Sequence, residues 1–179
     1  MNVCAKCGAS ATALTRTRLA TYNHTVLDMP VVLMNVVDRF SCKCGHAVEV
    51  IPNHEGLIAA VALCRIMQPV KLNGNEIRLL RKTLGLKAIE LAKRLDVSPE
   101  TLSRWENDAE VIGNSSERSF RIRIAISLTP KAPAISLDME SLMTMEIMPI
   151  RPVNWSPLWL EGVRVKDDEK KETQYDKAA

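Results

Sequence analysis

The chain has 179 residues with a formal net charge of +3, and 46% of its residues are hydrophobic and 25% charged. This balance is near the globular average and excludes a wholly disordered chain, a collagen-like repeat and a coiled-coil rod. The longest mostly apolar run, Leu57 to Cys64, is far shorter than the roughly 20 residues that span a bilayer. Since the first residues also lack the pattern of a secretory signal, we expect a soluble, cytoplasmic protein that does not enter membranes.

The charge is distributed unevenly, with net charges of +2 over residues 1–70, +3 over 71–128 and −2 over 129–179. An excess this small does not by itself indicate a nucleic-acid partner. Only 4% of the residues are aromatic, which argues against stacking on single-stranded bases. Any nucleic-acid function must therefore be argued from the positions of particular side chains.

Four of the five cysteines form two closely spaced pairs, Cys4 with Cys7 and Cys42 with Cys44, each followed by a glycine. Without an export signal, such pairs are typical of metal ligands rather than disulfides. Four thiolates around Zn²⁺ make a closed tetrahedral site with no open position for water, so we predict a structural zinc. The fifth cysteine, Cys64, lies in an apolar stretch and is expected in the core.

The second cysteine pair has one residue fewer between its members than the first, and Ser41 stands where the first cysteine of a longer spacer would fall. Two ligand sets remain open, because either Cys42 ligates from a distorted loop or His46 replaces it. No histidine lies in the patterns of zinc hydrolases or deaminases. We therefore expect no enzymatic activity.

Residues 1–70 are predicted to form a β-rich zinc-binding domain followed by one helix. Its strand-like stretches are rich in Val, Thr and Leu, with turn residues between them. They are Arg16–Leu19, Thr25–Leu27, Val31–Phe40 and Ala47–Ile51. Asn53 is suited to cap a helix that continues to Gln68 and ends at Pro69. This helix is apolar on most sides, so we expect it to be buried.

Residues 71–128 are predicted to form an all-α helix-turn-helix domain, which begins with a polar hinge containing Gly74. Periodic apolar residues indicate one helix ending at Gly85 and a second that includes Ile89. From Ala88 to Trp105 the spacing fits a helix-turn-helix. Its predicted core residues are Leu91, Ala92, Leu95, Val97, Leu102 and Trp105.

The turn and the next helix carry their own signals. Asp96 stands where this turn usually has glycine, and aspartate tolerates a positive φ better than most residues. Ser98 is suited to cap the helix, with Pro99 in its first turn and Glu100 near the positive end of the helix dipole.

The outer side of this helix is predicted to offer its N-terminal residues to base edges in the major groove of double-stranded DNA. Arg104 is suited to donate two hydrogen bonds to guanine or to bind a phosphate. Glu100 either accepts from a cytosine amino group or only caps the helix. The candidate DNA-binding residues are Lys87, Ser98, Glu100, Thr101, Ser103 and Arg104.

The element after Gly113 is ambiguous, because apolar residues in 120–128 alternate as in a strand and also share one helical face. We favour a helix, since a serine cap and several short helices precede it. Arg121 and Arg123 lie either on the DNA-facing side or on a solvated surface; the sequence does not distinguish the two.

Residues 129–179 are predicted to form an irregular extension interrupted by prolines, with a short helix from Asp138 to Met148. Trp155 and Trp159 are expected to pack on the protein or dock a partner. From Lys166 onward the chain is charged and is predicted to fray into a disordered end. The predicted fold class is α+β: a small β-rich zinc-binding domain, an Xre/Cro-like helix-turn-helix domain and this extension.

Four segments together resemble the MqsA (YgiT-type) family of zinc-containing antitoxins and regulators. They are Cys4–Gly8, Phe40–Gly45, Asn75–Leu86 and the Xre/Cro-like Glu90–Asn107. The resemblance covers residues 3–128. It implies a zinc-bound N-terminal domain, a homodimer on a palindromic operator, repression of the protein's own operon and, in true antitoxins, capture of a toxin by the zinc domain.

The residues and the resemblance together predict a sequence-specific, antitoxin-like DNA-binding repressor that acts as a homodimer with a structural zinc. The alternative is a protein-interaction module that neutralises a toxin through the zinc domain and binds DNA weakly or not at all.

Overall fold

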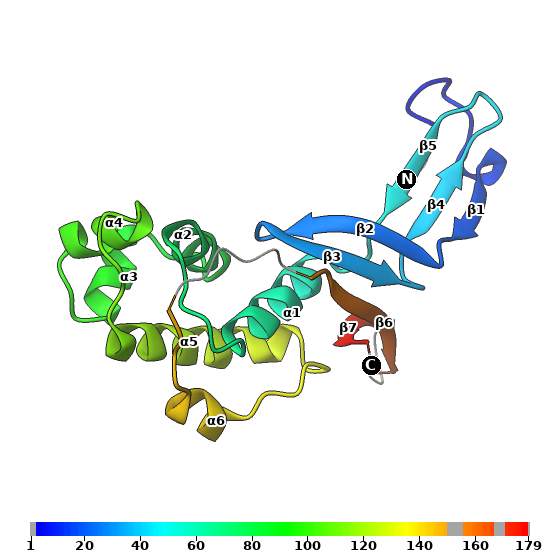
Figure 1. Cartoon of the computed structure of the whole chain (residues 1–179). Coiled ribbons are helices and arrows are strands. Elements are labelled where there is room, and N and C mark those ends of the chain that lie inside the picture. Colours follow the sequence, from blue (N-terminus) through cyan, green and yellow to red (C-terminus); the bar gives the residue numbers. More distant parts are fainter. Residues whose placement is uncertain (1–2, 150–155, 167–170, 179) are drawn as a thin grey trace.

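The computed structural model describes residues 3–149, 156–166 and 171–178. The predicted α+β class is confirmed, since β-sheets of the N-terminal region are followed by a group of helices (Figure 1). The strands are β1 (Thr15–Arg18), β2 (Thr21–Val26), β3 (Met29–Met34), β4 (Asp38–Ser41), β5 (Ala47–Val50), β6 (Leu158–Lys166) and β7 (Lys171–Lys177). The helices are α1 (His54–Ile66), α2 (Gly74–Thr83), α3 (Ala88–Arg94), α4 (Pro99–Glu106), α5 (Asn114–Leu128) and α6 (Met139–Thr144), with 3₁₀ turns η1 (Ala11–Ala13) and η2 (Thr129–Lys131).

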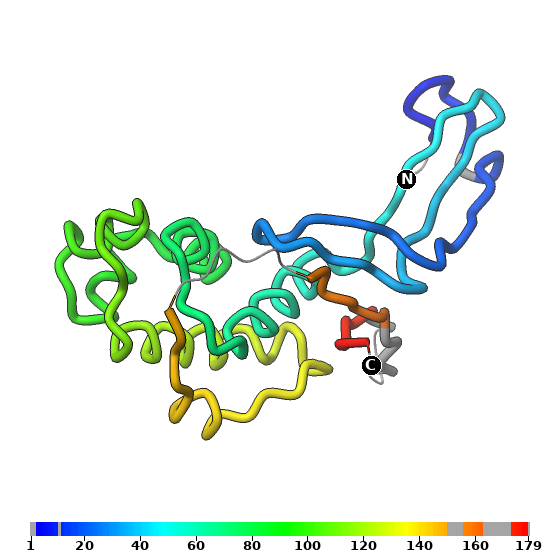
Figure 2. Tube along the Cα trace, in the orientation of Figure 1, coloured from blue at the N-terminus to red at the C-terminus, as the bar shows by residue number. Residues whose placement is uncertain are grey.

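One long, bent antiparallel hairpin supplies strands to two sheets, and its path is followed most easily in the tube of Figure 2. Near its turn β2 pairs with β3, and farther out β1 pairs with β4. The stretch predicted as one strand over 31–40 is divided at Asn35, whose φ is 52°. Beyond this bend, β1, β4 and β5 form a three-stranded sheet that projects from the body (Figure 1). We call this sheet with its cysteine loops, residues 3–18 and 38–50, the ribbon.

The end of the chain completes the second sheet, whose strand order is β2-β3-β6-β7 with β3 and β6 parallel. The expectation of a frayed end is wrong for residues 171–177, which form β7. Tyr175 is fully buried, and its hydroxyl donates to the carbonyl of Pro52. One buried aromatic within a polar stretch gives no periodic signal. Trp159 in β6 is 46% exposed, and Trp155 lies outside the described residues.

Helix α1 lies at the centre of the molecule and contacts α2, α5, η2 and β7. Most of its residues are buried, as its apolar sequence predicts. The Asn53 side chain caps it by accepting from the backbone N–H of Gly56 at 2.9 Å. The same side chain donates to the carbonyl of Thr173 in β7 at 2.9 Å, so the cap also attaches the last strand to the helix.

The helices after α1 follow the predicted order. Residues 120–128 belong to α5, and the favoured helix is confirmed because Phe120, Ile124 and Leu128 are buried together while Ile126 is 65% exposed. The N-cap of α5 is Gly113 rather than a serine. The short helix predicted from Asp138 to Met148 is α6, which is capped by Asp138 and ends at Thr144, earlier than expected.

The linker between α1 and α2 is held by Arg121 of α5 and is not a free hinge. The Arg121 guanidinium donates to the carbonyls of Ile66, Gln68 and Val70, each at 2.6 Å. Arg121 is completely buried, so both sequence interpretations of this residue, DNA-facing or solvated, are wrong. Burial lowers the pKa of its guanidinium, and the carboxylate of Glu117 opposes that shift.

Three further charged side chains complete this arrangement, which we call the linker clamp: Arg65, Glu76, Glu117 and Arg121. Arg65 binds both carboxylate oxygens of Glu76, at 2.5 and 2.9 Å, and also donates to backbone carbonyls of the linker. Glu117 accepts from Arg121 at 2.7 Å and from the backbone N–H of Leu72 at 2.9 Å. These buried charges are thus paired with each other and with linker backbone, except that Oε2 of Glu117 has no hydrogen-bond partner among the described residues and lies 3.6 Å from the Lys71 ammonium.

Gly74 permits a close approach of two helices. A Cβ atom at Gly74 would lie 2.5 Å from the carbonyl oxygen of Trp105 and 2.8 Å from the carbonyl carbon of Glu106. The backbone N–H of Gly74 also donates to Asp108 at 2.6 Å. The glycine that the sequence suggested for flexibility therefore lets α2 begin directly against the end of α4.

Replacing Gly74 with alanine is expected to destabilise the protein by about 1–3 kcal/mol, because the methyl group forces α2 away from α4. Helix propensity alone predicts the opposite effect, because alanine is a better helix former than glycine. The control is Gly113→Ala, where a Cβ meets nothing within 4 Å and we expect a loss below about 1 kcal/mol. Urea unfolding measures both, and equal stabilities of the two variants would contradict the close-approach argument.

Candidate nucleic-acid interface and metal centre

Two loops of the ribbon bring four sulfurs together. The Sγ atoms of Cys4, Cys7, Cys42 and Cys44 all lie within 4.8 Å of one another. The separations are 3.8 Å between Cys4 and Cys44 and 3.5 Å between Cys7 and Cys42. Sulfurs bound tetrahedrally at about 2.3 Å from Zn²⁺ are separated by about 3.8 Å, so this donor set fits one zinc ion.

The two loops have the same closure despite their different lengths. The backbone N–H of Cys4 donates to the backbone carbonyl of Ala9 at 2.7 Å, and the backbone N–H of Cys42 donates to the backbone carbonyl of His46 at 2.8 Å. In each loop a glycine with positive φ, 71° at Gly8 and 85° at Gly45, makes the turn behind the sulfurs. The shorter second loop therefore places Cys42 in the cluster, which could hold a metal without a ligand from His46.

The thiols of the cluster influence each other's ionisation. The pKa of Cys4 is lowered to about 6 because the backbone N–H groups of Cys7 and Lys6 donate to its sulfur. The Ala9 backbone N–H lowers the pKa of Cys7, but the neighbouring sulfurs, that of Cys42 foremost, raise it more, to about 12. Four thiolates this close together repel one another, so they cannot all ionise without a cation between them. A bound dication would offset this repulsion and stabilise the thiolate forms.

The ribbon has almost no core of its own. Where the structure describes burial within it, only Cys4 and Cys42 are buried. The charged side chains on its strands pair across the sheet, as Arg16 does with Asp38 at 2.6 Å and Arg39 with Glu49 at 2.8 Å. A metal that joins the two loops would therefore supply the stability that a small sheet cannot obtain from apolar burial.

The helix-turn-helix lies at the far end of the molecule from the cysteine cluster (Figure 1). Its predicted core is confirmed in the fully buried Leu91, Ala92 and Leu102 and in Trp105, which is 4% exposed. Ile89 is 69% exposed and does not belong to this core. These contacts fix α4 against α3 and decide which side of α4 faces outward.

The turn between α3 and α4 has the predicted chemistry. Asp96 adopts a φ of 55°, as expected for the position where glycine is usual. Ser98 caps α4 by accepting from the backbone N–H of Thr101 at 3.1 Å, and their two hydroxyls lie 3.1 Å apart. The hydroxyls of Ser98 and Thr101 are therefore already engaged with each other at the start of the helix.

Arg104 projects from the outer side of α4, with 66% of its side chain exposed. Its ion pair with Glu110, 49% exposed, is long at 3.9 Å. Exposed pairs of this kind contribute little, so the guanidinium is available for another partner. Ser103 is exposed beside it, and its carbonyl accepts from the side chain of Asn107 at 2.9 Å.

Glu100 is exposed in the first turn of α4 and carries a negative charge there. Its pKa is lowered because its own backbone N–H, the Ser98 hydroxyl and the Arg104 charge all stabilise the carboxylate. An ionised carboxylate repels phosphates but accepts a hydrogen bond from the amino group of cytosine. Contact of Glu100 with DNA would therefore be confined to base edges.

Two basic residues lie near α3. Lys87 is exposed at its N-cap position, where its backbone N–H donates to the Glu90 carboxylate at 2.7 Å. Arg123, one of the two undecided arginines, donates to the carbonyl of Arg94 at 2.6 Å and so binds the C-terminal end of α3.

Sequence reasoning missed the ion pair that holds the end of α4. Arg81 of α2 donates to both carboxylate oxygens of Glu106, at 2.6 and 3.1 Å, and to the carbonyl of Leu86 at 2.8 Å. Arg78 donates to the carbonyl of Glu106 at 2.8 Å. Both arginines are 25 or more residues from Glu106 in the chain, so no local pattern indicates their contacts with it.

Comparison with family models finds a match for residues 77–112 to a helix-turn-helix family. The matched segment contains α3 and α4 with the turn between them, so the chain carries a helix-turn-helix domain of the Xre type. Comparisons with curated proteins and with solved structures gave no match. Within the described residues, no helix is both long enough and apolar enough to cross a membrane.

Proposed function

We propose that this protein is a sequence-specific DNA-binding repressor of the antitoxin type, which binds a palindromic operator as a homodimer, carries a structural zinc and catalyses no reaction. The helix-turn-helix match supports the coarser part, a DNA-binding regulator of the Xre type. The observation that carries the proposal is the exposed outer side of α4, where Arg104 projects while Leu102 and Trp105 are buried.

The arrangement of α4 suits insertion into a major groove. Helices of this type present their N-terminal and outward-facing residues to base edges; in α4, Glu100 lies in the first turn and Arg104 projects from the last turn. Arg104 would read guanine, because its guanidinium offers two parallel donors. Lys87 and the first backbone amides of α3 would bind the phosphate backbone and set the register of the helix.

Dimerisation is part of the proposal because one recognition helix covers only a half-site. The exposed Ile126 on α5 is the kind of apolar residue that a second copy would cover. The two-fold symmetry of such a dimer would in turn require a palindromic operator.

The ribbon favours an additional role in protein binding, which is the second candidate function. Its three strands project from the body (Figure 1), and half-buried Phe40 and Val48 lie in register beside exposed Arg16. A sheet face of mixed apolar and basic character is suited to a partner protein such as a toxin. In this role the zinc would hold the sheet in shape without taking part in chemistry.

Replacing Arg104 with alanine tests the proposed function. A preferred duplex is first selected from a random pool, and binding is then measured at fixed salt. If Arg104 reads a base, the variant is expected to lose about 1–3 kcal/mol of binding free energy and its preference at one base pair. Arg39→Ala, at the opposite end of the molecule, is the matched control and is expected to bind as the unaltered protein does.

Unchanged DNA affinity of the Arg104→Ala variant would contradict the assignment of α4 as the reading helix. Failure to select any preferred duplex would favour the protein-interaction role of the ribbon over repression.

A further inference from the structure

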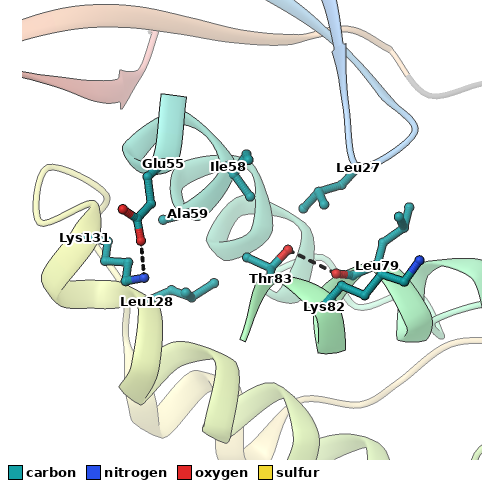
Figure 3. Close-up of a pocket in the computed structure, with 9 residues that line it drawn as sticks. All are labelled: Leu27, Glu55, Ile58, Ala59, Leu79, Lys82, Thr83, Leu128 and Lys131. Atoms are coloured by element: carbon teal, nitrogen blue, oxygen red, sulfur yellow. Dashed lines mark hydrogen bonds and ion pairs between the residues drawn. The ribbon is translucent and has the colours of Figure 1, made fainter. Parts of the chain in front are cut away.

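An apolar pocket lies where the β2–β3 turn, α1, α2 and the end of α5 meet (Figure 3). Its volume is about 370 Å³, within the range of small-molecule sites. The apolar walls are Leu27, Ile58, Ala59, Leu79 and Leu128. The pocket is separate from both the cysteine cluster and the outer side of α4.

The pocket is bounded by elements that other contacts hold in place. Leu27 covers one side from the hairpin turn with a φ of 51°, which is uncommon for a residue with a large side chain. The adjacent Asp28 accepts a hydrogen bond from Asn75 of α2, so the turn is attached to that helix. With α1, α2 and α5 already joined by the linker clamp, the walls are preformed and cannot easily collapse.

The polar groups around the pocket are distributed unequally. The hydroxyl of Thr83 donates to the carbonyl of Leu79 at 3.0 Å and is therefore satisfied within α2. Lys131 and Glu55 pair with each other on one side of the pocket (Figure 3). Lys82 lies on the other side, is exposed, and has no ion-pair partner within the part of the chain that the structure describes.

We propose that this pocket binds a small amphiphilic carboxylic acid of the medium-chain fatty-acid class. The apolar tail lies among the five apolar walls, where its burial provides the affinity. The carboxylate remains at the rim beside the ammonium of Lys82, for which the described residues provide no ion-pair partner. The Lys131–Glu55 pair closes the opposite side and limits the length of the tail.

The charges of the rim favour an anion over the alternatives. Two lysines and one glutamate line the pocket, which leaves one positive charge in excess. A cationic amphiphile would be repelled by Lys82, and a neutral alcohol would gain the apolar contacts but not the ion pair. The inference is independent of the proposed DNA binding, because it concerns walls that do not include α3 or α4.

The test measures binding of octanoate to the full zinc-loaded chain by calorimetry, together with the melting temperature. We expect saturable binding at one site and a rise in melting temperature, because a ligand of the folded state stabilises it. Octanol is expected to bind about three- to fivefold more weakly, the size of effect that one exposed ion pair provides. No saturable binding of octanoate below its micellar concentration, or equal affinity for octanol, would overturn the proposal.

Three variants locate the site. Lys82→Met keeps the apolar stem and is expected to lower the octanoate affinity to that of octanol while leaving octanol binding unchanged. Lys93→Met, on the exposed side of α3, is the matched control and is expected to change neither. Thr83→Trp places a ring in the pocket and is expected to abolish binding of both ligands while circular dichroism shows the native helix content.

Equal effects of the Lys82 and Lys93 variants would overturn the role of Lys82. Full binding by a folded Thr83→Trp variant would show that octanoate lies elsewhere. Because all these measurements are made without DNA, they give the same answer whether or not the proposed repressor function holds.

Discussion

Replacing Arg121 with alanine is expected to lower the free energy of unfolding by about 3–5 kcal/mol, the usual cost of removing one partner from a buried charge pair. The substitution leaves Glu117 charged at zero exposure, and its remaining ion-pair partner in the described part of the chain is the Lys71 ammonium, 3.6 Å away. It also removes the Arg121 donors of the carbonyls of Ile66 and Gln68, whereas the carbonyl of Val70 still accepts from Arg65 at 3.1 Å. Both losses expose the protein to the full desolvation cost of unpaired polar groups.

Urea unfolding followed by circular dichroism measures this effect, and two further variants calibrate it. Arg123→Ala in the same helix is the matched control and is expected to cost less than about 1 kcal/mol, because Arg123 is exposed and makes one hydrogen bond. Arg121→Lys keeps the charge but cannot fork to several carbonyls, so an intermediate loss is expected. If Arg121→Ala and Arg123→Ala were equally stable, the linker clamp would not hold the linker.

Removing the proposed zinc is expected to unfold the ribbon while the helices remain folded. Structural zinc contributes binding free energy on the order of 10 kcal/mol, and the strands of the ribbon bury no residue that would replace it. Chelation, or Cys42→Ser, should therefore make the chain susceptible to trypsin within the strands at Arg16, Arg18 and Arg39. Helix α1 and the helix-turn-helix depend on a separate apolar core and should resist.

Native mass spectrometry of the purified protein is expected to show one zinc per chain, and Cys64→Ala is the control because Cys64 lies in α1 outside the cluster. The ligands bind as thiolates, and Cys7 must release its proton when zinc enters, since its pKa is raised to about 12 without metal. Zinc affinity should therefore fall as the pH is lowered from about 7 to about 5. A metal-free ribbon that resists trypsin as well as the loaded one would contradict the structural role.

The helix-turn-helix was the most predictable part of the structure, because its determinants are local. Leu91, Ala92, Leu102 and Trp105 are buried at the predicted spacing, and Asp96 has the predicted positive φ. The cysteine cluster was also predictable, since spacing and a following glycine are sufficient to indicate each loop. The sequence left the choice between Cys42 and His46 open, because loop closure depends on backbone hydrogen bonds.

The parts that were predicted incorrectly depend on contacts between distant segments. Arg121 lies in a polar-apolar alternation that indicates a solvated side chain, and its burial depends on linker carbonyls more than fifty residues earlier as well as on Glu117. A glycine at position 74 suggests a flexible hinge from residue type alone. In the structure, glycine is needed there because the backbone at the end of α4 leaves no room for a Cβ atom. Likewise β7 is a polar stretch in which Tyr175 is buried and is held by α1 and by its hydrogen bond to Pro52.

The parallel pairing of β3 with β6 has a consequence for biosynthesis. Strand β3 ends at Met34 and β6 begins at Leu158. Strand β3 can pair with β2 early, but it can pair with β6 only after most of the polypeptide has been made. During translation the local contacts of α2 to α5 are available first, whereas loop closure over this separation is slow. The helical half would thus emerge from the ribosome and fold while β3 still presents an open edge to the cell.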